Sequence, residues 1–195
     1  MNANPHLKGN SAHLIINEVV GNGYSQLLGK LEVAGEQAKV VIANPNGITC
    51  DGCSFINTPA ITLTTGKPQF SPQGAYSAIE VKKGSVVIGK QGMDLQAQNY
   101  ADIISRSIEL NGKINAKNLS LMQGNNRIDF EKGAVNSLTG EDIKPTISID
   151  TKALGGMYAN QIRLVSTEKG VGVNLSDIHT NQHSVNLTVD GKNYL

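Results

Sequence analysis

Tryptophan is absent from this chain of 195 residues, and cysteine occurs only twice. Charged residues make up 17% of it, against roughly 25% in an average globular protein. The net charge of +1 excludes a global basic field for nucleic acid or anionic lipid. No apolar run approaches the roughly 20 residues of a membrane-spanning helix, and the first residues show no basic start and no apolar stretch of a signal peptide. We therefore expect a soluble, polar chain without an export signal of its own.

Glycine, by contrast, is abundant, with 21 residues, and hydrophobic residues reach 39%, too many for a disordered chain. Short apolar runs that alternate with polar residues recur along the sequence, which indicates half-buried strands. These runs are 13–20, 40–43, 61–65, 85–88, 119–122, 162–165 and 185–189. Turn-forming pairs such as Asn22-Gly23 and Asp190-Gly191 separate them. We expect at most one short helix or turn, within residues 91–106.

An internal repeat favours a β-solenoid. Segment 111–122 matches segment 154–165, and 185–189 repeats the same alternation about half that distance further on. The matching pairs are Gly112 and Gly155, Ile114 and Met157, Ala116 and Ala159, Leu119 and Ile162, and Leu121 and Leu164. A period of a little over twenty residues, with two or three short strands in each, fits one coil of a solenoid. A β-sandwich with irregular spacing is the alternative.

The two cysteines form a single Cys50-Asp51-Gly52-Cys53 motif. Zinc would need two further ligands, and His179 and His183 are far away in sequence. A thioredoxin-like site would need a helix at the first cysteine. A small structural disulfide is the reading that we favour, and two reduced, buried thiols are the alternative.

Two short turn motifs stand out. Proline fixes φ and Asn-Gly tolerates positive φ, so each motif predicts a stiff turn between strands. The first motif is Asn44, Pro45, Asn46, Gly47 and Ile48, and its echo near the start is Asn4, Pro5, His6 and Leu7.

No catalytic, metal or cofactor motif is visible. The spacing of His179 and His183 lacks the acid of a zinc helix, and we expect a solvated loop there. The carboxylates are scattered, so we expect each to be a solvated turn or loop charge. These acids are Asp94, Asp102, Glu109, Asp129, Glu131, Glu141, Asp142 and Asp150.

The run 41–58, which contains the first turn motif and both cysteines, resembles the signature of the two-partner secretion (TPS) domain. That domain belongs to the filamentous haemagglutinin, haemolysin and contact-dependent growth inhibition exoproteins. Asn4 to Leu7 resembles its second short motif, with His6 where the family more often has Asn. Ser54 stands where Gly is frequent. Further matching segments are 16–19, 31–35, 63–68, 153–159 and 162–173.

This resemblance implies an all-β fold, a right-handed parallel β-helix with extra-helical hairpins. It implies a non-enzymatic secretion domain without cofactor or metal, in which the two turn motifs serve recognition. The partner would be an outer-membrane TpsB-type transporter, which binds the extended chain through its periplasmic POTRA domains, and the downstream exoprotein would meet host or neighbouring cells. The destination would be the cell surface or the medium, reached through the periplasm.

On this resemblance, residues 1–175 are the later portion of the secretion domain, without its N-terminal part, and residues 176–195 begin the following repeat region. Two other functions are weighed against secretion: a β-helix polysaccharide-active enzyme, and an adhesive module that binds glycans or proteins. Several carboxylates converging in one groove would favour the enzyme.

Overall fold

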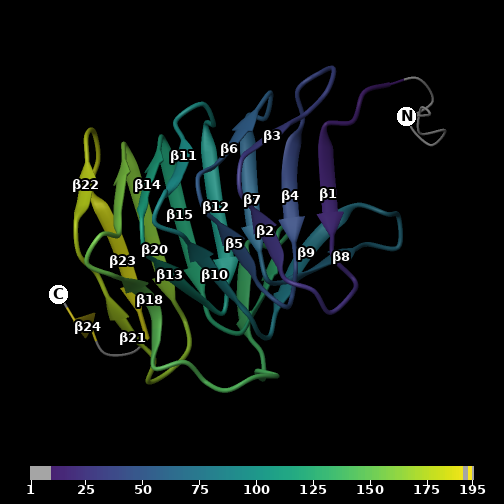
Figure 1. Cartoon of the computed structure of the whole chain (residues 1–195). Coiled ribbons are helices and arrows are strands. Elements are labelled where there is room, and N and C mark those ends of the chain that lie inside the picture. The colour runs from purple at the N-terminus through teal and green to yellow at the C-terminus, as the bar shows by residue number, and fades with distance from the viewer. Residues whose placement is uncertain (1–9, 191–192, 195) are drawn as a thin grey trace.

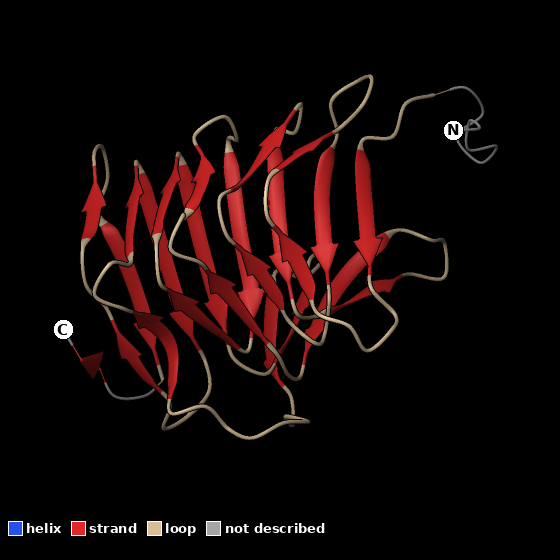
Figure 2. Ribbon diagram, in the orientation of Figure 1, coloured by secondary structure: helices blue, strands red, loops and turns tan. Residues whose placement is uncertain are grey.

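The computed structural model describes residues 10–190 and 193–194. Throughout these residues the chain forms strands joined by turns (Figure 2). The described part contains no helix, and hence none long and apolar enough to cross a membrane. Residues 91–106, where a short helix was allowed, form two strands instead. The seven strands predicted from the sequence are all present.

Three parallel sheets make the walls of a solenoid, and the chain visits them in a fixed order. Sheet A holds β1 (Leu14–Glu18), β4 (Lys39–Ala43), β7 (Ala60–Thr64), β12 (Tyr100–Ser105), β15 (Asn118–Gln123), β20 (Gln161–Ser166) and β23 (Val185–Val189). Sheet B holds β2 (Ser25–Leu27), β5 (Ile48–Cys50), β10 (Ser85–Ile88), β13 (Ser107–Leu110), β18 (Ile147–Thr151), β21 (Gly172–Asn174) and β24 (Asn193–Tyr194). Sheet C holds β3 (Lys30–Glu32), β6 (Cys53–Ile56), β11 (Met93–Leu95), β14 (Lys113–Ala116), β19 (Gly156–Ala159) and β22 (Ile178–Thr180). Each coil therefore runs from A to B to C, and the coils stack along the axis from β1 to β24 (Figure 1).

The predicted repeat is confirmed in register. Leu119 of β15 pairs in parallel with Ile162 of β20, and Leu121 pairs with Leu164. The next coil follows with Ile162 opposite Val185. From 162 to 185 the period is 23 residues, as expected for one coil, whereas from 119 to 162 it is 43. The longer interval is still a single coil, because a hairpin is inserted in it.

A fourth, antiparallel sheet stands outside the solenoid. It consists of β8 (Lys67–Phe70), β9 (Tyr76–Val81), β16 (Asn126–Asp129) and β17 (Ala134–Ser137). Both of its hairpins leave the chain between a sheet A strand and a sheet B strand, that is, at the same corner of two different coils. Their apolar faces pack on the outer face of sheet A in a second small core, where Ile79 and Val81 meet Ile104, Met122 and Val165.

Inside the solenoid, aliphatic side chains stack in ladders along the axis. Leu63, Ile103, Leu121 and Leu164 occupy paired positions in four consecutive coils, and none has exposed surface. Each such side chain contributes about 1.5–3 kcal/mol through burial. The alternation of apolar and polar residues in the sequence therefore corresponds to inside and outside of the solenoid wall.

The repeated glycines have a steric reason at the corner between sheets B and C. A Cβ on Gly112 would lie 2.2 Å from the carbonyl oxygen of Gly89, and one on Gly155 would lie 2.1 Å from that of Leu110. The backbones of adjacent coils approach so closely here that only glycine fits.

We predict that a charge inside the ladder unfolds the solenoid. Leu121→Asp and Leu164→Asp should each lower the free energy of unfolding by at least about 3 kcal/mol, since the carboxylate would be buried without a partner. The measurement is urea denaturation followed by circular dichroism. Gln161→Asp, at an exposed position of the same strand as Leu164, is the control and should change little. Equal effects of Leu164→Asp and Gln161→Asp would contradict the stacked-coil packing.

Candidate functional site

The first turn motif lies at the corner between sheets A and B, where β4 ends and β5 begins. The turn closes by a hydrogen bond from the Gly47 N–H to the Asn44 carbonyl oxygen, at 3.1 Å. Gly47 has a φ of +132°, which side-chain-bearing residues rarely adopt. In the two hairpin-bearing coils the same corner is opened into the excursions of the antiparallel sheet. The motif is thus a short form of a corner that can also carry an insertion.

The Asn44 side chain is fully buried and bonds in two directions. Its Oδ1 accepts the backbone N–H of Asn46 at 3.0 Å, which holds the turn from within. Its Nδ2 donates to the Gly23 carbonyl at 2.8 Å and to the Ser25 hydroxyl at 2.9 Å, both in the preceding coil. Asn44 therefore fixes its own turn and joins two coils.

Asn46 also links the turn to the preceding coil. Its Nδ2 donates to the Gly21 carbonyl at 2.7 Å. Pro45 is buried. The following coil approaches it so closely that a Cβ added to Gly84 would lie 2.6 Å from the Pro45 carbonyl oxygen. The turn is held between its two neighbouring coils, and a folded domain offers a partner little of it beyond Asn46.

A column of buried polar side chains runs along the end of sheet A, and Asn44 begins it. The backbone N–H of Asn44 donates to the carbonyl oxygen of Thr64, which places Asn44 beside Thr65 of the next coil. The column continues in the same way through the following coils. Its members, at 1% exposure or less, are Asn44, Thr65, Ser105, Gln123 and Ser166. Within it the Ser105 hydroxyl donates to Gln123 Oε1 at 2.6 Å, and Gln123 Nε2 donates to the Ile103 carbonyl at 3.1 Å. These side chains satisfy one another and the backbone where the chain turns.

The two cysteines lie on either side of the corner between sheets B and C. Cys50 ends β5 and Cys53 begins β6. They are joined in the structure, with Cα atoms 5.4 Å apart and both side chains inside the solenoid core. Gly52 between them has a φ of +75° and donates its N–H to the Gly92 carbonyl at 2.8 Å. The bridge closes a tight corner without reaching any other coil.

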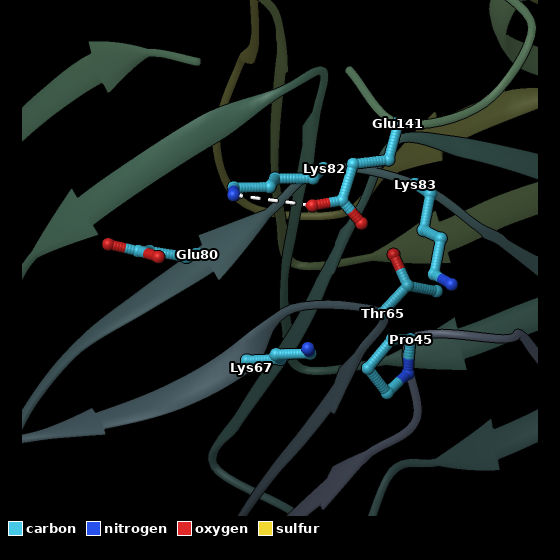
Figure 3. A pocket seen from close by; sticks show the side chains of 7 residues that line it. All are labelled: Pro45, Thr65, Lys67, Glu80, Lys82, Lys83 and Glu141. Atoms are coloured by element: carbon cyan, nitrogen blue, oxygen red, sulfur yellow. Dashed lines mark ion pairs between the residues drawn. The ribbon is translucent and has the colours of Figure 1, made fainter. Parts of the chain in front are cut away.

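A small pocket of about 170 Å³, lined by three lysines and two glutamates, adjoins the turn. Figure 3 shows Lys67, Lys82 and Lys83 around it, beside Pro45. Lys82 pairs with Glu141 at 3.3 Å. With Glu80 and Glu141 also in its lining, the pocket gives the turn a neighbourhood of mixed charge on the surface of the folded domain.

The carboxylates are not all solvated, contrary to the prediction for Asp102, which is half-buried on a strand. Asp142 is exposed in its loop, as predicted, but its charge is paired. Arg106, between two serines at the A–B corner, is only 4% exposed and pairs with Asp142 and with Glu168. Two of its nitrogens donate to Glu168, at 2.7 and 3.1 Å. The hydrogen bonds with Glu168 are the largest cause of a raised pKa of Arg106, and those with Asp142 raise it further.

Arg106 holds the loop after β17 against the solenoid, and the sequence carried no signal for this. Its partners are 36 and 62 residues away in the chain, and only the stacking of coils brings them together. Asp102 departs from the predicted solvated carboxylate because it lies on sheet A under the antiparallel sheet. Burial there raises the pKa of its carboxyl group.

His179 and His183 do not form a metal site together. His179 lies on β22 and its Nε2 is 2.9 Å from Asp177 Oδ1, while His183 is an exposed turn residue. Within residues 10–190 no three His, Cys, Asp or Glu side chains gather in a metal-binding group. Asn4, Pro5, His6 and Leu7 lie outside the described residues, so the second motif stays a prediction.

The geometry defines a class of protein: a parallel β-helix with hairpins at one corner. A family profile described as "TPS secretion domain" matches residues 2–194. A solved structure, "Crystal structure of filamentous hemagglutinin secretion domain", superposes with a TM-score of 0.75 at 32% identity, over 83% of this chain and 57% of that one.

Among curated proteins, "tRNA nuclease CdiA" of Yersinia mollaretii is 49% identical over 97% of this chain. "16S rRNA endonuclease CdiA" of Enterobacter cloacae is 48% identical over the same share, and "Toxin CdiA" of Escherichia coli 49%. The chain spans 6% of the length of these relatives. The chain belongs to the TPS secretion domain family, and its right-handed parallel β-helix with extra-helical hairpins is confirmed.

We predict that the cysteine bridge is present and contributes modestly to stability. Protein purified under oxidising conditions should show no free thiol and a mass about two daltons below the reduced form. Because the closed loop is so short, reduction should cost less than the roughly 2–4 kcal/mol of longer loops. Denaturation with and without reductant measures this difference. Stoichiometric, tight zinc binding by the reduced protein would contradict the structural role.

We predict that Asn44→Ala lowers the free energy of unfolding by roughly 2–4 kcal/mol, because the Asn46 N–H and the Gly23 carbonyl lose a buried partner. Asn22→Ala, at an exposed position of the corresponding corner in the preceding coil, is the control and should cost little. Urea denaturation compares the two. An Asn44 variant as stable as the control would show that the turn does not depend on this side chain.

Proposed function

We propose that this domain directs the export of a longer protein by presenting the unfolded Asn44–Ile48 segment to an outer-membrane transporter of the TpsB type. The periplasmic POTRA domains of the transporter take up the chain, which folds into the solenoid after crossing. The exported protein is secreted or stays at the cell surface. The observation that carries the proposal is the burial of Asn44, which no partner can contact in the folded domain.

The physical properties of the chain support passage in an unfolded state. Its bridge spans only Cys50 to Cys53, so it leaves no large covalent loop to thread. The strands of each coil pair with other coils, so the structure disappears when the stack is opened and re-forms by addition of coils. Asn4 to Leu7 are proposed as a second segment that the transporter recognises.

We propose further that the remainder of the exported protein acts against neighbouring cells as a growth-inhibition toxin. The curated relatives are named tRNA nuclease, 16S rRNA endonuclease and toxin, and they are far longer than this chain. The nuclease chemistry would then lie elsewhere in the protein, and this domain itself would be non-enzymatic. Residues 1–175 are proposed as the secretion domain and 176–195 as the start of the next repeat region.

The test separates recognition of the motif from loss of stability. Asn44→Ala and Gln123→Ala both remove a fully buried amide from the same polar column, but only Asn44 belongs to the turn motif. Each variant is placed in the full-length exoprotein, and secretion is measured together with the stability of the purified domain. We expect secretion to fall at least tenfold for Asn44→Ala and much less for Gln123→Ala at a similar loss of stability.

Capture by the transporter gives the second measurement. POTRA domains of the transporter, immobilised on beads, should bind the chain when it is diluted from urea and should not bind the folded domain. Secretion that falls in proportion to stability for both variants would reduce the motif to a structural turn. Binding of the folded domain as well as the unfolded chain would overturn capture in the unfolded state.

A further inference from the structure

A groove of about 550 Å³ lies on the outer face of sheet A, beneath the edge of the antiparallel sheet. Strands β1, β4, β7 and β12 form its floor, and residues of the two hairpins form its wall. Its volume falls in the range of small-molecule sites, about 300–1,000 Å³. It lies apart from the turn motif, whose residues do not line it.

Aromatic side chains gather at this groove in a chain that has few of them. The whole sequence contains three Phe, five Tyr and no Trp. Tyr76, Tyr100 and Phe130 line the groove, and Phe70 packs on Tyr76 with ring centroids 6.0 Å apart. Tyr100 is 62% exposed and Phe130 43%. Folding alone does not require such exposed rings, which are typical of binding surfaces.

Two polar groups in the groove call for hydrogen-bonding partners. The Tyr76 hydroxyl is buried and has no hydrogen-bond partner among the described residues. Asp102 lies on the floor, between Thr62 and Ser120 in register, and its charge acts on the Tyr76 phenol. Burial and this charge together raise the pKa of Tyr76, so its hydroxyl keeps its proton and is a donor at neutral pH. A carboxylate has about four acceptor positions, so the Asp102 carboxylate can accept hydrogen bonds from a ligand in the groove.

The required ligand therefore offers an acceptor and a donor close together, beside an apolar face. An ammonium or guanidinium group would satisfy Asp102 but cannot accept the Tyr76 proton. Lys39 also lines the groove, but a ligand that is only an anion would be repelled by Asp102 and could not donate to its carboxylate. A sugar hydroxyl both accepts and donates, and the C–H face of a pyranose ring packs on aromatic rings.

We propose that this groove is a binding site for a neutral hexopyranoside, formed only in the folded domain and separate from its recognition by the transporter. Tyr100 and Phe130 pack against the sugar ring, the Tyr76 hydroxyl donates to one sugar hydroxyl, and Asp102 accepts from the same or the adjacent one.

Saturation-transfer NMR and calorimetry with the methyl glycosides of glucose, galactose, mannose and N-acetylglucosamine test this site. At least one should bind, with a dissociation constant on the order of millimolar. Tyr76→Phe should weaken that binding about tenfold, and Tyr100→Ala by at least as much. Tyr158→Phe is the matched control, because it removes a hydroxyl that is bonded to Asp177 outside the groove, and its affinity should be unchanged.

Measurements of stability and of secretion distinguish a loss of sugar binding from a loss of folding or of export. Since the Tyr76 hydroxyl has no partner within the described part of the chain, Tyr76→Phe should melt at or above the temperature of the unmodified protein. Its exoprotein should be secreted normally, because the groove does not exist in the unfolded chain. Absence of binding for all four glycosides, or unchanged affinity in Tyr76→Phe and Tyr100→Ala, would overturn the proposal. So would a clear loss of stability in Tyr76→Phe, which would reveal a partner within the protein.

Discussion

Parallel backbone hydrogen bonding between successive coils is the interaction on which the rest of this structure depends. Each inner strand of sheets A, B and C bonds to the coil before it and the coil after it, and no strand of these sheets pairs within its own coil. A single coil therefore has neither a closed hydrogen-bond network nor a closed core. Ile103, Leu121 and Leu164 can form a ladder only because the register is kept from coil to coil.

The two kinds of corner differ in whether the stack of coils can accept an insertion. At the corner between sheets B and C the coils approach so closely that Gly112 and Gly155 are required. At the corner between sheets A and B, buried polar side chains bond to the backbone instead, and there the chain can either turn sharply at Asn44–Gly47 or leave as a hairpin. The hairpins return because they bury a second apolar core and because Arg106 holds the loop after β17.

The same dependence on stacking connects the fold with secretion. Because little of the structure is local, the chain has little that would resist being held extended by a transporter. Once the coils assemble, Asn44 is buried and the groove between sheet A and the hairpins is formed. Under the two proposals made above, the turn segment acts in the unfolded chain and the groove acts in the folded domain.

Several features followed from the sequence by itself. The alternation of apolar and polar residues determined β10 of sheet B and every strand of sheet A except β12. The matches of Gly112 with Gly155 and of Leu121 with Leu164 determined the register of two neighbouring coils. Asn44, Pro45 and Gly47 determined a tight turn through local backbone preferences. These features are readable because strand period and turn geometry depend on neighbouring residues.

Only the tertiary structure decided the rest. It placed the hairpins of residues 67–81 and 126–137 in one sheet, although about 45 residues separate them, because both leave the same corner of the solenoid. It brought Arg106 to Asp142 and Glu168, and it buried Asp102 beside Tyr76. Each of these contacts joins residues of different coils, and their distance in space is set by the number of residues that each coil and excursion contains, which no local pattern expresses.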